Sequence, residues 1–102
     1  MDDPNQIEVP PSFLALFTST SGQRLTEPMK TVRERYELCE DLAQMLTERA
    51  ADAHFKVGNE RQVLQQMLAG LSGDESPVQL AEAWWVVRRL AELLDWEPLP
   101  EA

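Results

Sequence analysis

The sequence predicts an all-α protein: a small helical bundle of three main helices, preceded by one short helix. Apolar side chains recur every three or four residues over long stretches of the chain, which is the period of an amphipathic helix. Residues that cap or break helices stand at the ends of these stretches. A chain of 102 residues is expected to form one domain with a modest core, here placed at residues 12–96.

The N-terminal part combines a predicted arm with a short helix. Residues 1–11 carry three prolines among polar residues and are expected to be flexible. Ser12 is a candidate N-cap for a helix over residues 12–17, whose apolar side chains include Phe13 and Phe17. Because so short a helix does not persist alone, it must dock on the main body, on a second subunit or on a target.

The longest predicted helix covers residues 27–57 and follows a loop at residues 18–25. Thr26 is its candidate N-cap, with Pro28 in the first turn, and Gly58 suits the left-handed residue after a helix. The main apolar stripe comprises Val32, Tyr36, Cys39, Ala43, Leu46, Ala50 and Val57. A second ridge comprises Leu38, Leu42 and Met45, and the opposite side carries Glu34, Glu37, Asp41, Glu48 and Asp52. Two ridges predict two neighbours.

The third and fourth helices are predicted over residues 60–71 and 77–95. Asn59 is the candidate cap of the third helix, and the short link Gly58–Asn59 predicts a helical hairpin. Ser76 is the candidate N-cap of the fourth helix, with Pro77 at its first position. Residues 97–102 are acidic and rich in proline, and we expect them to form a flexible tail.

Two tryptophans break the pattern of the fourth helix, because Trp85 and Trp96 project onto its charged side. One interpretation places Trp85 over Arg89 in a cation–π contact and folds Trp96 back onto the core. The other makes both indoles anchors for a partner, since tryptophan and arginine dominate interface hot spots. The sequence leaves both interpretations open.

No motif for catalysis, a cofactor or a metal is found in the sequence. The four glycines belong to no phosphate-binding loop. The single cysteine, Cys39, and the single histidine, His54, are about 22 Å apart along one helix, so they cannot share an ion. Cys39 lies in the apolar stripe, where a thiol packs as a small hydrophobe. We therefore expect no cofactor and no enzymatic activity, with a small enzyme kept as the remote alternative.

Charge and hydropathy limit the partners. The formal net charge of −9 argues against binding to nucleic acid, which needs a clustered cationic face. There is no apolar run long enough to span a membrane, and the first residues, MDDPNQIEVPPS, lack the pattern of a signal peptide, so we expect none. One cysteine and the absence of a signal favour a cytoplasmic protein.

Three stretches, PPSFLALF, RYELCEDLAQML and AWWVVRRLAELLDW, together resemble a family of small bacterial proteins that often carry the label "ATPase with chaperone activity". The resemblance spans most of residues 9–96. It implies a bacterial cytoplasmic protein, and its label implies nucleotide hydrolysis. The sequence departs from that label because it has no phosphate-binding loop.

These observations predict a non-enzymatic protein–protein interaction module: an adaptor, chaperone-like factor or regulator that can form a homodimer. The alternative is an acidic regulator that occupies a basic groove or mimics nucleic acid. The candidate partner-binding residues are Trp85, Arg89, Trp96, Phe13, Phe17, Leu38 and Met45.

Overall fold

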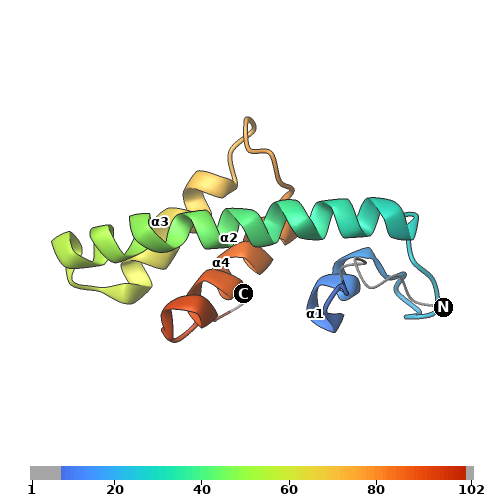
Figure 1. Ribbon diagram of the computed structural model, residues 1–102, viewed down its shortest axis with the longest axis horizontal. Coiled ribbons are helices and arrows are strands. Elements are labelled where there is room, and N and C mark those ends of the chain that lie inside the picture. The colour runs from blue at the N-terminus through green and yellow to red at the C-terminus, as the bar shows by residue number, and fades with distance from the viewer. Residues whose placement is uncertain (1–7, 101–102) are drawn as a thin grey trace. The chain divides into compact units, whose positions relative to one another are not determined.

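The computed structural model describes residues 8–100 and confirms the all-α prediction for them (Figure 1). Its elements are α1 (Pro11–Leu14), the 3-10 turn η1 (Ala15–Phe17), α2 (Met29–Val57), α3 (Glu60–Leu71) and α4 (Leu80–Leu94). The chain divides into two compact units, Met1–Leu38 and Cys39–Ala102, and α2 contributes to both. Much of the predicted arm at residues 1–11, and the end of the tail, lie outside the described residues.

In the first unit, the short helix begins at Pro11 and not at Ser12. Pro10 is its N-cap, and the Pro10 carbonyl accepts the N–H groups of Phe13 and Leu14, each at 3.0 Å. Proline suits the first helical position because its backbone angle is already helical and no N–H is needed there. The segment continues as η1 to Phe17, so the predicted extent is nearly right while the predicted cap is wrong.

Aromatic contacts hold this segment against the first turns of α2. The Phe13 ring is fully buried, and its centroid lies 5.5 Å from that of Phe17 and 5.6 Å from that of Tyr36. Of the three docking places left open by the sequence, the structure therefore shows the one within the chain.

The loop that follows is closed by backbone hydrogen bonds. Thr18 and Leu25 form a single antiparallel bridge, and the Ser19 N–H donates to the Arg24 carbonyl at 2.8 Å. Gly22 occupies the left-handed region with φ 77°. The Thr26 N–H is held by the Phe17 carbonyl at 2.7 Å, so Thr26 belongs to this loop and α2 begins three residues later.

In the second unit, the predicted hairpin between α2 and α3 is confirmed. Gly58 has φ 77°, and its N–H donates to the His54 carbonyl at 2.7 Å, which terminates α2. The Asn59 side chain accepts the Gln62 N–H at 3.0 Å and so caps α3.

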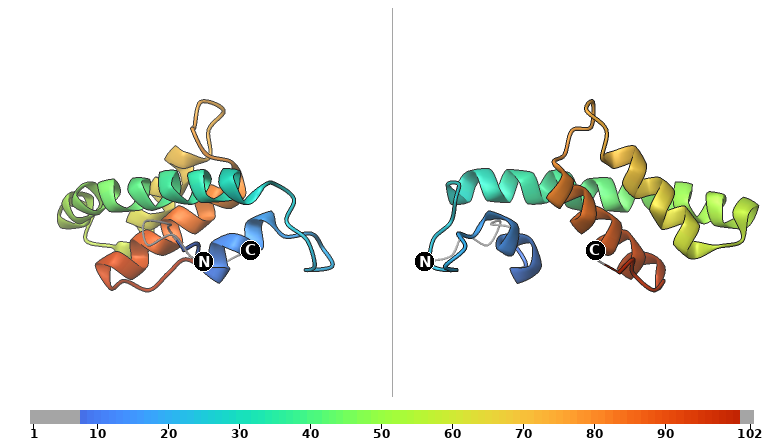
Figure 2. Two further views of the ribbon diagram at one scale, coloured as in Figure 1. Left: turned by 45° about the vertical axis from the view of Figure 1, so that its right-hand side comes forward. Right: turned by 180° about the vertical axis from the view of Figure 1, so that it is seen from behind.

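The start of α4 differs from the prediction. Gln79 is the N-cap, and its N–H donates to the Glu82 carboxylate at 2.9 Å. Ser76 instead accepts the Val78 N–H at 3.2 Å, which closes a turn before the helix. The predicted cap at Ser76 is therefore wrong, and α4 begins at Leu80, three residues later than predicted. The loop between α3 and α4 projects away from the helices (Figures 1 and 2).

The core of the second unit joins α2, α3 and α4. Its fully packed members are Ala50, Val63, Leu64, Val87, Leu90 and Ala91. Around them pack half-buried side chains from all three helices and from the segment after α4, including Trp96 and Leu99. Of these six residues α2 contributes only Ala50, and its Leu46 and Ala53 pack around the cluster.

Candidate protein-interaction surface

Neither tryptophan singled out in the sequence stands free in solvent. Trp85 is 8% exposed. Trp96 is half-buried against the core of the second unit, and its ring centroid lies 5.0 Å from that of His54. Trp96 thus folds back onto the core, as one of the two interpretations of the sequence expected.

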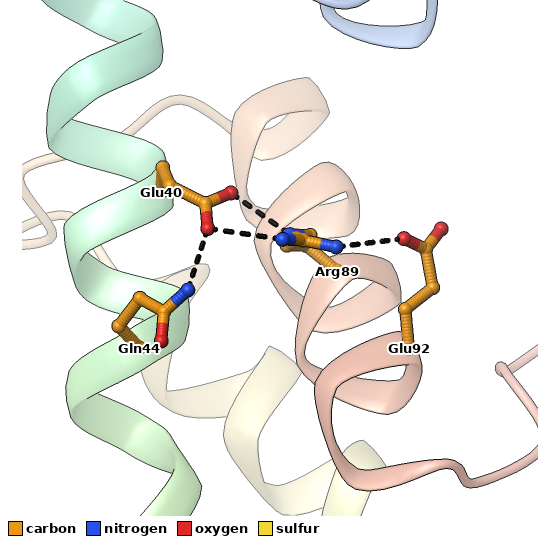
Figure 3. A network of polar contacts seen from close by, with 4 residues as sticks. All are labelled: Glu40, Gln44, Arg89 and Glu92. Carbon is orange, nitrogen blue, oxygen red and sulfur yellow. Dashed lines mark hydrogen bonds and ion pairs between the residues drawn. The ribbon is translucent and has the colours of Figure 1, made fainter.

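Arg89 is engaged within the chain. Its guanidinium binds the Glu40 carboxylate at two points, Nε to Oε1 at 2.9 Å and Nη2 to Oε2 at 3.3 Å (Figure 3). Gln44 donates to the same carboxylate at 2.8 Å, and Glu92 accepts from Arg89 Nη1 at 3.2 Å. This network links α2 to α4 and gives the guanidinium a structural role.

Electrostatics favour the charged forms of the pair. Burial alone would raise the pKa of the Glu40 carboxyl, but hydrogen bonds from Arg89 and Gln44 and the guanidinium charge outweigh it and lower that pKa. The hydrogen bond to Glu40 is the largest cause that raises the pKa of Arg89, against the smaller effect of its own burial. Both groups are therefore charged at neutral pH.

The remaining candidate residues divide by exposure. Phe13 is buried, and Phe17 and Leu38 are half-buried. Met45, by contrast, is 73% exposed. The ridge of Leu38, Leu42 and Met45 therefore turns outward only at Met45.

The most exposed large apolar side chain in the described residues is Phe55, at 90%. Sequence reasoning did not single it out. The signal was present, because Phe55 lies about 140° around the helix from Ala50, on the side opposite the buried stripe. The prediction considered the apolar residues within the stripe, and Phe55 lies outside it.

Phe55 and Met45 belong to one face of α2, defined here as the outward face: Asp41, Met45, Glu48, Asp52 and Phe55. All five residues are exposed. The two apolar residues are about 15 Å apart along the helix, with Glu48 and Asp52 between them. Glu48, Arg49 and Asp52 line a surface depression. The face therefore offers apolar contacts and negative charge together.

Other features of the described residues add no second candidate. No group of three or more histidine, cysteine, aspartate or glutamate side chains there is placed to hold a metal ion. A further depression is lined by Glu60, Arg61, Glu97, Pro98 and Pro100. None of the helices in residues 8–100 has the length and apolarity needed to cross a membrane.

Comparisons with protein-family models, with curated proteins and with solved structures find no match to this chain. The resemblance to the chaperone-labelled bacterial family stays a prediction.

Proposed function

We propose that this protein is a non-enzymatic protein–protein interaction module that binds its partner through the outward face of α2. The observation that carries the proposal is the exposure of Phe55 and Met45 on this face. Burying one large apolar side chain contributes roughly 1.5–3 kcal/mol, so two such anchors can supply a large share of a binding free energy.

The stability of the chain does not account for Phe55, which is 90% exposed. A phenylalanine on an exposed helix surface has lower helix propensity than alanine and gains nothing from burial within its own chain. Its interaction with another protein would be the compensating gain. The experiment therefore measures stability and binding in the same variants.

The test is affinity capture from extracts of the cells that produce the protein, using wild-type chain and the double variant Met45→Ala/Phe55→Ala as baits. The matched control is Leu80→Ala, because Leu80 is 60% exposed on α4. We expect specific proteins on the wild-type and Leu80→Ala baits and their loss from the double variant. Capture that is the same on all three baits contradicts the proposal.

The control for folding is urea unfolding of each bait. Alanine is the best helix former, so the double variant should be as stable as wild type or slightly more stable. A double variant that is strongly destabilised would show that the two side chains stabilise this chain, and the proposal would fail on that result as well.

The homodimer stays a prediction tested by sedimentation equilibrium. A monomer mass at tens of micromolar would remove it, without touching the proposal of a partner of another kind. The acidic-regulator alternative is favoured by the carboxylates of the outward face.

A further inference from the structure

We propose that the partner of the outward face is a cationic protein surface, in which lysine or arginine side chains meet Asp41, Glu48 and Asp52 while apolar groups receive Met45 and Phe55. This inference rests on the proposed function and adds the chemistry of the partner. It is argued from charge complementarity.

Three carboxylates of the outward face are accessible to a partner. Asp41, Glu48 and Asp52 are exposed and lie on the same side of α2. Within residues 8–100, none of these three carboxylates takes part in an ion pair. Their charge is therefore available to an incoming cation.

Two cationic side chains lie near these carboxylates. Arg49 and Lys56 lie at one edge of the outward face, about 100° and 120° around the helix from the buried stripe. The opposite edge carries the uncharged residues Gln44 and Ala51, so the three carboxylates at the centre outnumber the two cations. A partner that approaches over Glu48 and Asp52 therefore meets net negative charge.

Other occupants of the outward face are disfavoured by its charge. A second copy docking through the same face would set carboxylates against carboxylates, which costs several kcal/mol in a desolvated interface. Nucleic acid and anionic membranes carry the same sign of charge as this face. A purely apolar partner would bury three carboxylates with no counter-charge, which is also unfavourable. A cationic protein surface satisfies both the charges and the apolar side chains.

The probe is a synthetic amphipathic helical peptide, with lysines on one face and leucines on the other, and a fluorescent label for anisotropy. Binding is measured to the full chain at about 0.05 M and about 0.3 M NaCl, because added salt weakens a charge-steered contact. The reference peptide has glutamate at every lysine position. We expect the lysine peptide to bind and the glutamate peptide not to bind.

A matched pair of variants separates the face from net charge. Glu48→Gln/Asp52→Asn removes two charges from the outward face, and Asp74→Asn/Glu75→Gln removes two exposed charges from the loop before α4. We expect the first variant to lose affinity about tenfold and the second less than about twofold. Equal losses would mean that the peptide senses only total charge, and would overturn the proposal.

A second pair tests the apolar part. Phe55→Ala should weaken the lysine peptide severalfold, and Leu80→Ala should leave binding unchanged. If the lysine peptide does not bind while capture from extracts still depends on Phe55, the interaction module stands and its partner is not cationic. If capture also loses its dependence on Phe55, both proposals fail.

Discussion

At the scale of single residues, the end of α4 depends on Asp95. Asp95 has φ 58°, in the left-handed region, where the N–H of Trp96 donates to the Ala91 carbonyl at 2.8 Å. Among residues 8–100 it is the only residue other than glycine with positive φ. This geometry turns the chain so that Trp96 returns to the core. It is costly for a residue with a Cβ, and a carboxylate at a helix C-terminus is also unfavourable.

Asp95→Gly should therefore stabilise the protein by about 0.5–1 kcal/mol, because glycine adopts this conformation without strain and removes the adverse charge. Urea unfolding monitored by circular dichroism measures the effect. Asp95→Ala is the control, since it removes the charge but keeps the Cβ, and it should be less stable than Asp95→Gly. Equal stability of the two variants would show that the backbone conformation carries no cost here.

At the scale of elements, α2 has one buried side and one exposed side, and two adjacent alanines lie on different sides. Ala50 is fully buried in the core shared with α3 and α4, whereas its neighbour Ala51 is exposed. Close packing leaves no room for added methylene groups at Ala50. The same chemical change at these adjacent positions should thus have different consequences.

Ala50→Leu should destabilise the fold by about 1–3 kcal/mol through overpacking, and Ala51→Leu should change stability by less than about 0.5 kcal/mol. Thermal and urea unfolding of both variants test this difference. A tolerated leucine at position 50 would contradict the close packing of α2 on its neighbours in the second unit.

The Glu40–Arg89 ion pair joins α2 to α4. This pair makes part of the stability of the fold depend on pH. Because the Glu40 pKa is lowered in the folded state, its contribution is fully present above the ordinary carboxyl pKa of about 4.3 and is lost as pH falls through the folded value. At neutral pH, Glu40→Gln should cost about 1 kcal/mol.

The measurement is urea unfolding of wild type and Glu40→Gln at a series of pH values. The difference in unfolding free energy should shrink as the pH falls below about 4, since wild type then loses the charge that the variant lacks. Glu37→Gln, an exposed change on the same helix, is the control. A difference that stays constant into strong acid would rule out the ion pair as its source.

At the scale of the whole molecule, the main feature is an excess of negative charge. The chain carries 18 acidic residues against 9 lysines and arginines, giving a formal net charge of −9. Repulsion among these charges favours expansion and keeps copies apart. Charge repulsion therefore lowers the stability that the burial of the apolar stripes provides. Salt screens this repulsion and should raise the stability of the folded state.

Raising NaCl from about 0.05 M to about 0.5 M should therefore increase the Tm, by a few degrees. Differential scanning calorimetry gives the shift. The variant Asp74→Asn/Glu75→Gln, which carries two fewer negative charges, should begin from a higher Tm and gain less from salt. A Tm that falls with salt would mean that attractive ion pairs outweigh the repulsion.

Local signals in the sequence determined the number of helices, their order and most of their ends. Asn59 and Gly58 act within one or two turns of the backbone, so the α2–α3 hairpin could be predicted from neighbouring residues alone. The beginning of α4 could not, because Ser76 and Gln79 both form hydrogen bonds of the capping type and the choice between them depends on where Glu82 is placed.

The candidate site was decided by tertiary structure. Helical periodicity places Trp85 and Arg89 on a charged face, yet Trp85 is buried and Arg89 binds Glu40, 49 residues earlier in the chain. Phe55 drew no attention in the sequence and proved the most exposed large apolar residue described. Periodicity reports which residues share a side of a helix. Which side is covered depends on packing between distant segments, and that is fixed only when the chain folds.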